Sequence, residues 1–315
     1  MLAKKTLSLQ PIMEVIAQSG SNRQYLREQL TDGSTQIRVR GTSREENHAF
    51  ITMARHFYSL GLPVPEVYWV SEDEMEYTQQ DLGSTLLYDY LKPARESGKF
   101  TDEDKLLLHR TMHALARIQT EGAVGMDWSV CYPVASMNRR SIFWDLNYFK
   151  YCYLKLTGIE FLEDALEDDF ERLADRILAE PQDAFLYRDC QSRNVMLVNG
   201  ANGLEPYFID FQGGRRGSRY YDYASFLWQA KAAYPAELRE ELFADSGLDR
   251  ATLNHFVLFR LLQVLGAYGF RGLYERKAHF IESIPQALVN LRELFQTNQE
   301  LMTQYPYIYA LSNRL

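Results

Sequence analysis

The stretch AFLYRDCQSRNVMLVNGANGLEPYFIDFQGG, residues 184–214, decides the fold prediction. Its two short apolar runs, VMLV at 195–198 and YFID at 207–210, flank the turn sequence NGANG, a pattern typical of a β-hairpin. Pairing of these strands would bring Asn194, just before the first strand, to the same end of the hairpin as Asp210. A carboxylate and an amide oxygen at one end of a hairpin could share a Mg²⁺ ion, which prefers hard oxygen ligands.

The residues before the hairpin have the pattern of a small sheet with one helix. Apolar residues with helical spacing predict a helix over Glu45–Leu60, stopped by Gly61 and Pro63. The strand-like runs around this helix are separated by turn sequences such as TDGS. These runs cover residues 12–16, 25–30, 36–40, 67–70 and 75–80.

The rest of the chain is dominated by helical patterns, at 104–119, 143–156, 163–178, 220–233, 252–267 and 284–299. We therefore predict a two-lobed α+β fold. Residues 1–82 would form a small antiparallel-sheet lobe with one main helix. Residues 83–315 would form a larger, mostly helical lobe that carries the hairpin.

Composition argues against several classes of protein. The net charge of −8 does not favour a nucleic-acid ligand. Three cysteines without C-x-x-C spacing indicate neither a disulfide framework nor a zinc site. The N-terminus lacks the apolar core of a signal peptide, and no run of about 18 uncharged apolar residues is present. We expect a cytoplasmic protein that has no membrane partner.

Two segments, YRDCQSRN at 187–194 and DFQG at 210–213, resemble the H-R-D-x-x-x-x-N and D-F-G loops of protein kinases. Together with the segments SGSNRQYLR, QQDLGSTLLYDYL and FIDFQGGRRGSRYYDYASFL, they make the chain similar to the aminoglycoside phosphotransferase and choline kinase family, which has the protein-kinase-like fold. Within that family the chain looks most like bacterial kinases that phosphorylate N-acetylmuramate and N-acetylglucosamine at the anomeric hydroxyl.

The resemblance implies an enzyme that uses ATP and Mg²⁺. It implies that Asp189 is the catalytic base with Arg188 beside it, and that Asn194 and Asp210 are the Mg²⁺ ligands. Asp222 would brace the segment YYDYA, although an aspartate there also fits a helix N-cap. The nucleotide contacts implied by the resemblance are Ser19, Gly20, Ser21 and Gln80.

The chain departs from the kinase pattern at three places. Tyr187 stands where kinases have the histidine of H-R-D, no lysine occurs on the predicted third strand, and the turn SGSNRQY has one glycine where kinases have three. Arg38 and Arg40 are then the basic candidates to bind ATP and to pair with Glu46 on the following helix. Because the two arginines alternate with apolar residues, a solvated strand face is the other interpretation.

The arginines after Asp210 bear on the acceptor. Arg215, Arg216 and Arg219 lie where this family has its substrate-facing loop, and either solvation or attraction of an anionic acceptor explains them. A polycationic aminoglycoside would instead require acidic residues. We also place Arg193 and Asp222 among the acceptor-site residues.

The predicted function is ATP- and Mg²⁺-dependent transfer of a phosphoryl group to a hydroxyl of a small molecule, and the favoured acceptor is an amino sugar. Two alternatives remain open. One is a kinase for an aminoglycoside or a small alcohol such as choline, thioribose or homoserine. The other is a pseudokinase without turnover, which Tyr187 and the missing lysine would support.

Overall fold

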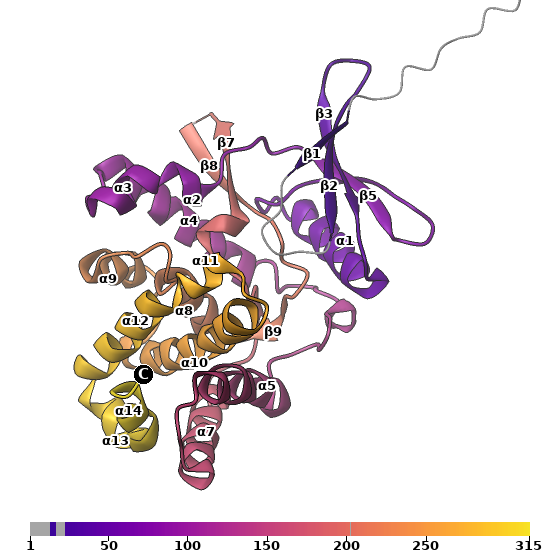
Figure 1. The fold of residues 1–315 in the computed structure, drawn as a ribbon. Helices are drawn as coiled ribbons and strands as arrows, with labels where there is room; N and C mark the ends of the chain where they lie inside the picture. Colours follow the sequence, from indigo (N-terminus) through magenta and orange to yellow (C-terminus); the bar gives the residue numbers. More distant parts are fainter. Residues whose placement is uncertain (1–12, 17–22, 202) are drawn as a thin grey trace, which may run out of the picture.

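The computed structural model of the chain describes residues 13–16, 23–201 and 203–315. It has a small lobe built on a sheet and a larger helical lobe, which lie side by side (Figure 1). Strand β5 ends at Gln80 and the first helix of the large lobe begins at Leu87. The predicted two-lobed α+β architecture is confirmed.

The small lobe contains a five-stranded antiparallel sheet with the strand order β1-β2-β3-β5-β4. Side chains alternate across it, so Ile37 and Val39 of β3 point into the core while Arg38 and Arg40 point to the opposite face. The strands are β1 (Met13–Ile16), β2 (Gln24–Gln29), β3 (Thr35–Arg40), β4 (Val67–Val70) and β5 (Glu76–Gln80).

One helix, α1 (Arg44–Ser59), covers the inner face of this sheet. Ser43 caps its N-terminus by accepting a hydrogen bond from the Glu46 amide. Its buried side also faces the large lobe, where Phe50 stacks on Phe211 with ring centroids 4.8 Å apart. Helix α1 therefore joins the two lobes through a shared aromatic core.

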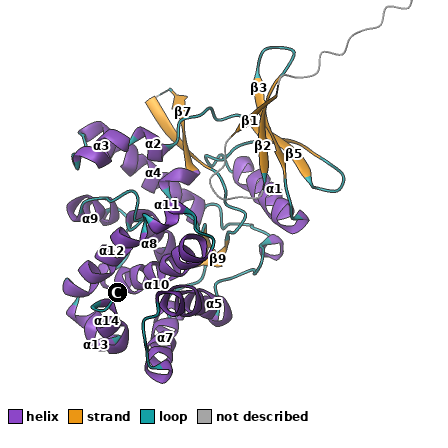
Figure 2. Ribbon diagram, in the orientation of Figure 1, coloured by secondary structure: helices purple, strands orange, loops and turns teal. Residues whose placement is uncertain are grey.

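The large lobe is mainly helical, and its strands form two short pairs (Figure 2). The hairpin pairs β7 (Val195–Gly200) with β8 (Gly203–Phe208), and β6 (Ala184–Leu186) pairs with β9 (Arg215–Gly217). The helices are α2 (Leu87–Tyr90), α3 (Lys92–Ser97), α4 (Asp102–Thr120), α5 (Arg139–Phe149), α6 (Lys155–Thr157), α7 (Glu163–Leu178), α8 (Tyr220–Leu227), α9 (Ala236–Ala244), α10 (Arg250–Tyr268), α11 (Ala278–Ile281), α12 (Ile284–Gln296), α13 (Gln299–Gln304) and α14 (Pro306–Ser312). Shorter helical turns are η1 (Trp128–Val130), η2 (Lys150–Leu154), η3 (Ser192–Asn194) and η4 (Gly269–Tyr274).

The sequence prediction placed the main elements correctly, but it did not include the short helices α3, α11, α13 and α14, and it differs at other points as well. The helix predicted over 220–233 ends at Leu227, and the chain turns before α9, which the prediction did not include. The helix predicted over 143–156 begins at Arg139, because Asn138 and Ser141 form a capping box there. The β6–β9 pair was not predicted, because its strands are only three residues long.

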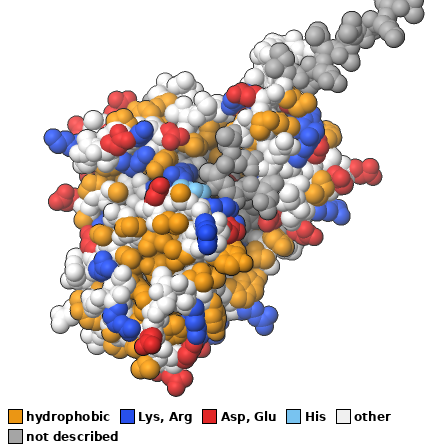
Figure 3. All heavy atoms as spheres, in the orientation of Figure 1, with side chains coloured by type: hydrophobic (Ala, Val, Ile, Leu, Met, Phe, Trp, Pro, Cys, Tyr) orange, Lys and Arg blue, Asp and Glu red, His pale blue; other side chains and the backbone are white. Residues whose placement is uncertain are grey.

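Helix α10 is the centre of the large lobe. Among the described residues, the segment Arg250–Tyr274 is the one helix long and apolar enough to cross a membrane by composition, and 67% of its apolar window is buried inside the fold. Its hydrophobicity is therefore explained by core packing. Acidic and basic side chains are interspersed over the face shown in Figure 3, as expected from the moderate net charge of −8.

Candidate active site

The loop that contains Asp189 connects β6 to the hairpin and is held by a buried carboxylate. Asp222, in the first turn of α8, accepts hydrogen bonds from the backbone amides of Tyr187 at 2.8 Å and Arg188 at 2.9 Å. Gln119 of α4 donates a third bond at 2.9 Å. Burial raises the pKa of Asp222 to about 6, against the lowering effect of these three hydrogen bonds. Asp222 thus fixes the loop backbone, as the brace prediction requires.

Two other expectations for Asp222 are wrong. It is fully buried, so it does not face an acceptor. It also does not cap α8, because the N-cap position is Arg219 and the Asp222 carboxylate is directed to the catalytic loop instead.

Asn194 and Asp210 lie together because of the hairpin. Val195 pairs with Phe208, and the Ile209 amide donates to the Asn194 carbonyl at 3.0 Å. The Asn194 side-chain amide donates to the Asp189 carbonyl at 2.9 Å, which orients its oxygen away from the loop. Asp210 has a left-handed backbone, with φ of 65°, at the point where the chain leaves β8. The predicted convergence of the two residues is confirmed.

The Asp189 and Asp210 side chains are both accessible, with exposed fractions of 52% and 39%. Desolvation by the surrounding protein raises the pKa of the Asp210 carboxylate. A hydrogen bond from Gln212 and the charge of Arg23 oppose this effect. The charge of Asp189 raises it further, which shows that the two carboxylates act on each other. A cation between them would relieve this repulsion.

The donor set fits Mg²⁺ with water and phosphate as the remaining ligands. Asn194 and Asp210 supply hard oxygen atoms. Among the described residues there is no group of three His, Cys, Asp or Glu side chains able to hold a metal ion alone. A magnesium site here would therefore depend on ligands from a bound nucleotide.

Tyr187 takes over a structural function within the loop. Its ring is almost fully buried, and its hydroxyl donates to the Ile209 carbonyl. It lies edge-on to Phe208 and Phe211. The residue that replaces the kinase histidine therefore connects the catalytic loop to the segment that carries Asp210.

Arg188 also anchors the loop. Its guanidinium donates to both carboxylate oxygens of Asp145 on α5, at 2.8 and 3.0 Å. Burial disfavours the charge, but Asp145 and other neighbours outweigh it and raise the Arg188 pKa. Arg188 thus links the loop of the proposed base Asp189 to α5. A direct catalytic role of Arg188 stays a prediction.

The predicted partners of Glu46 are wrong. Arg38 pairs with Glu28 and Glu76, and Arg40 pairs with Glu76, all on the outer face of the sheet. The physical reason is strand alternation, which turns both arginines away from α1 because Ile37 and Val39 fill the inner face.

Arg23 pairs with Glu46 instead. It directly precedes β2, its side chain is 3% exposed, and its Nη2 lies 3.3 Å from Glu46 Oε2. Its Nη1 lies 3.9 Å from Asp210 Oδ1. The sequence carried a signal for this pair that we missed. Arg23 and Tyr25 are two residues apart, so in an extended chain their side chains lie on the same face, and Arg23 lies inside the segment SGSNRQYLR.

The other nucleotide candidates have mixed outcomes. Ser19, Gly20 and Ser21 lie outside the described residues. Gln80 lies at the end of β5, where its side-chain oxygen accepts from the Glu66 amide at 3.4 Å. Next to it, Arg27 of β2 binds Asp81 through two hydrogen bonds of 2.6 and 3.2 Å. The connection between the lobes is thus tied to the sheet, while a nucleotide contact from Gln80 stays a prediction.

The arginines after Asp210 do not converge on one point. Arg215 is 3% exposed and donates twice to the Gly213 carbonyl. Arg216 is exposed on β9, and Arg219 donates to the Ser246 carbonyl beyond α9. The interpretation of these three residues as one acceptor-binding loop is therefore wrong, because β9 turns Arg215 and Arg216 to opposite faces and Arg219 lies beyond the strand. Arg193 also lies apart, stacked on Tyr88 with its guanidinium 4.3 Å from the ring centroid.

A residue that we did not predict, Arg260 of α10, reaches the base. Its Nη2 lies 3.5 Å from Asp189 Oδ1, and its Nη1 donates to the Tyr221 hydroxyl at 3.0 Å. Only 11% of its side chain is exposed. The sequence signal was a single arginine within the apolar run HFVLFRLLQVL, where a buried charge requires a partner.

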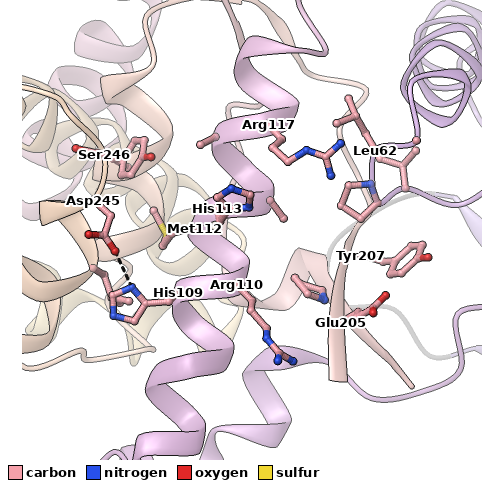
Figure 4. Close-up of a pocket in the computed structure, with 18 of the residues that line it drawn as sticks. Leu62, His109, Arg110, Met112, His113, Arg117, Glu205, Tyr207, Asp245 and Ser246 are labelled. Carbon is pink, nitrogen blue, oxygen red and sulfur yellow. Dashed lines mark ion pairs between the residues drawn. The ribbon is translucent and has the colours of Figure 1, made fainter. Parts of the chain in front are cut away.

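A groove of about 1000 Å³ lies elsewhere, between α4, the loop after α1 and strand β8. Figure 4 shows Arg110, His113 and Arg117 along α4 at this groove, and His109 paired with Asp245. None of the residues Asp189, Asn194 and Asp210 lines it. The groove is therefore separate from the candidate active site around Asp189.

Comparison with known proteins agrees with this geometry. The sequence profile of the phosphotransferase enzyme family matches residues 13–256. The chain belongs to this family. By this membership the chain is a phosphotransferase. A search of curated protein sequences finds no match.

Solved structures show that the chain has the kinase-like fold. A choline/ethanolamine kinase family protein from Mesorhizobium loti is 13% identical, with a TM-score of 0.61, and the match covers 95% of this chain and 92% of the other. Ethanolamine kinase from Plasmodium vivax is 14% identical, with a TM-score of 0.59 and coverage of 93% and 84%. A thermostable mutant of the aminoglycoside phosphotransferase APH(4)-Ia, in a complex with ADP and hygromycin B, is 15% identical, with a TM-score of 0.57 and coverage of 89% and 93%.

Proposed function

We propose that this phosphotransferase moves the γ-phosphoryl group of ATP to a hydroxyl of an amino sugar that carries an acidic group, such as N-acetylmuramate. N-acetylglucosamine, which lacks that group, would be a poorer acceptor. The proposal combines the family's chemistry with the charge pattern around the base.

The observation that carries the choice of acceptor is the buried guanidinium of Arg215 in the cluster beside Asp189. Asp145 pairs with Arg188, and both Asp189 and the buried Asp222 act on Arg260, whereas the hydrogen bonds that the described residues show for Arg215 go to the Gly213 carbonyl. Burial and the neighbouring Arg188 lower the pKa of Arg215 to about 10. An anionic group on the acceptor would compensate this charge, whereas a polycationic aminoglycoside or choline would meet repulsion.

The chain's own residues support in-line transfer. Asp189 would accept the proton of the attacking hydroxyl, since its side chain is accessible and its loop is rigidly held by Asp222. Asn194 and Asp210 would hold Mg²⁺, which when bound neutralises charge on the nucleotide phosphates. Arg260 would hold Asp189 and contact the acceptor's anionic group.

The alternatives rest on the neighbours. The relatives described above are choline, ethanolamine and aminoglycoside kinases, so a cationic acceptor is the main rival within enzymes. A pseudokinase without turnover is the rival of another class. The accessible Asp189 carboxylate, next to Asn194 and Asp210, argues against it, because a protein that only binds nucleotide does not need a base.

A matched acceptor series tests the proposal. ATP consumption is measured with N-acetylmuramate, N-acetylglucosamine and kanamycin, using the wild type, Arg260→Gln and, as a control, Arg216→Gln on the exposed face of β9. We expect kcat/KM to be highest for N-acetylmuramate. Arg260→Gln should lower that value by about 10- to 100-fold, in line with the roughly 1.5–3 kcal/mol of a charged hydrogen bond, and Arg216→Gln should not. Faster phosphorylation of kanamycin than of either sugar would refute the proposal.

A further inference from the structure

Strand β3 brings no cation to the site where the nucleotide phosphates would lie. Its inward side chains are Ile37 and Val39, which are 6% and 0% exposed. In kinases, a lysine on the third strand pairs with a glutamate of the following helix and contacts the phosphates. Here the helix retains the glutamate, Glu46 in the first turn of α1, but the strand lacks the lysine.

A cation from another strand occupies the place next to Glu46. Arg23 precedes β2, and Tyr25, two residues later, lies opposite Val39 in the sheet register. The alternation of side chains therefore puts Arg23 on the same inner face as Val39. Its guanidinium spans from Glu46, at 3.3 Å, to Asp210, at 3.9 Å.

The two contacts of Arg23 differ in length, and the longer one would leave the guanidinium able to bind a phosphate. The Glu46 contact is a hydrogen bond that holds the guanidinium from α1. The contact with Asp210 is longer and involves a carboxylate that is 39% exposed. A guanidinium keeps its charge in proteins, so Arg23 offers a cation at this position although its side chain is only 3% exposed.

We propose that Arg23 is the phosphate anchor of this enzyme, which moves the function of the third-strand lysine to the residue before β2. The inference rests on the proposed use of ATP and goes beyond it by assigning a residue. The planar guanidinium offers two parallel donors to phosphate oxygens, which a lysine does not. Glu46 is then a positioning residue that acts through Arg23.

The experiment compares binding of ATP and of adenosine by titration calorimetry, with Mg²⁺ present and no acceptor. Adenosine lacks phosphates, so its affinity reports the nucleoside pocket and the folded state. The variants are Arg23→Met and, as a matched control on the outer face of the same sheet, Arg40→Met. Arg23→Lys is included in case the methionine variant does not fold.

We expect Arg23→Met to weaken ATP binding by at least about tenfold, the effect of losing a charged hydrogen bond, while adenosine binding stays within about twofold. Arg23→Lys should weaken ATP binding less than Arg23→Met and, like it, spare adenosine. Arg40→Met should leave both affinities unchanged. Equal losses for ATP and adenosine, or no loss of ATP affinity in the Arg23 variants, would overturn the assignment.

The outcomes also separate this inference from the proposed function. A wild type that binds Mg-ATP, with Arg23 variants that bind it equally well, rejects the anchor and leaves ATP as the donor. A wild type that binds no ATP rejects the proposed function itself, and the anchor with it.

Discussion

At the scale of single residues, two carboxylates and one amide lie at one end of a hairpin. Asp189 comes from the loop before β7, Asn194 directly precedes β7, and Asp210 follows β8. Asp222 and Tyr187 hold this arrangement through hydrogen bonds to backbone groups, and the Asn194 side chain adds a bond to the Asp189 carbonyl. These bonds do not use the carboxylates of Asp189 and Asp210, so substitution of either carboxylate should leave the loop conformation intact.

Asp189→Asn is expected to lower kcat by about 10²- to 10⁴-fold, because the amide cannot accept a proton from the attacking hydroxyl. Affinity for ATP should change little, since Asp189 is not among the proposed metal ligands. Steady-state kinetics with the best acceptor, together with calorimetric titration of ATP, measures both quantities. A variant that retains wild-type kcat would remove Asp189 from the mechanism.

Asp210→Asn should have a different signature. The amide keeps the shape of the side chain but loses the charge that attracts Mg²⁺, so affinity for Mg-ATP should fall by at least about tenfold. Adenosine binding, which needs no metal, serves as the control. Normal Mg-ATP affinity in this variant would contradict the assignment of Asp210 as a metal ligand.

At the scale of elements, α10 combines the active-site Arg260 with a buried histidine near its N-terminal end. His255 is 4% exposed, and its Nδ1 lies 2.8 Å from the Tyr305 hydroxyl, just before α14. Burial and the charge of Arg176 lower the pKa of His255 to about 4, with Asp249 acting in the opposite direction. The histidine is neutral in the fold at pH values where it would be protonated in the unfolded chain.

This depressed pKa predicts acid sensitivity. The unfolded state takes up a proton near pH 6.5 and the folded state only near pH 4, so stability falls as the pH is lowered through this window. The His255 contribution to the loss between pH 7 and pH 5 is roughly 2 kcal/mol. Urea unfolding of His255→Gln at the two pH values should show a smaller loss than the wild type. His113→Gln, on the exposed face of α4, is the control, and an equal pH effect in the wild type and His255→Gln would disprove the prediction.

At the scale of the whole molecule, the two lobes share aromatic packing around α1. Phe57 lies edge-on to Phe185 of the large lobe, with ring centroids 4.8 Å apart, and also contacts Phe211. All three rings are at most 1% exposed. The lobes are therefore expected to unfold together in one transition.

Truncation of this shared core tests the coupling. Phe57→Ala should lower the free energy of unfolding by about 3–5 kcal/mol, because it removes a fully buried ring in contact with both lobes. Differential scanning calorimetry should still show one transition at a lower Tm. Two separate transitions in the wild type would mean that the lobes are independent. Leu106→Ala, at an exposed position of α4, is the control and should change the Tm little.

The sequence by itself predicted the two lobes, the main elements and the hairpin that brings Asn194 and Asp210 together. Turn residues, the capping serine before α1 and the change from strand to helix periodicity are local signals, and each is written in a few consecutive residues. The convergence of Asn194 and Asp210 was predictable for the same reason, because one short hairpin joins them.

Only the tertiary structure decided which charges meet. Arg23 and Glu46 are 23 residues apart, and Arg260 is 71 residues from Asp189, so no local pattern links them. Arg38, Arg40 and the arginines after Asp210 had suitable sequence positions, but strand alternation turned them elsewhere. A charged side chain acts on what lies within a few ångströms of its tip, and that depends on how the strands and helices pack rather than on distance along the chain.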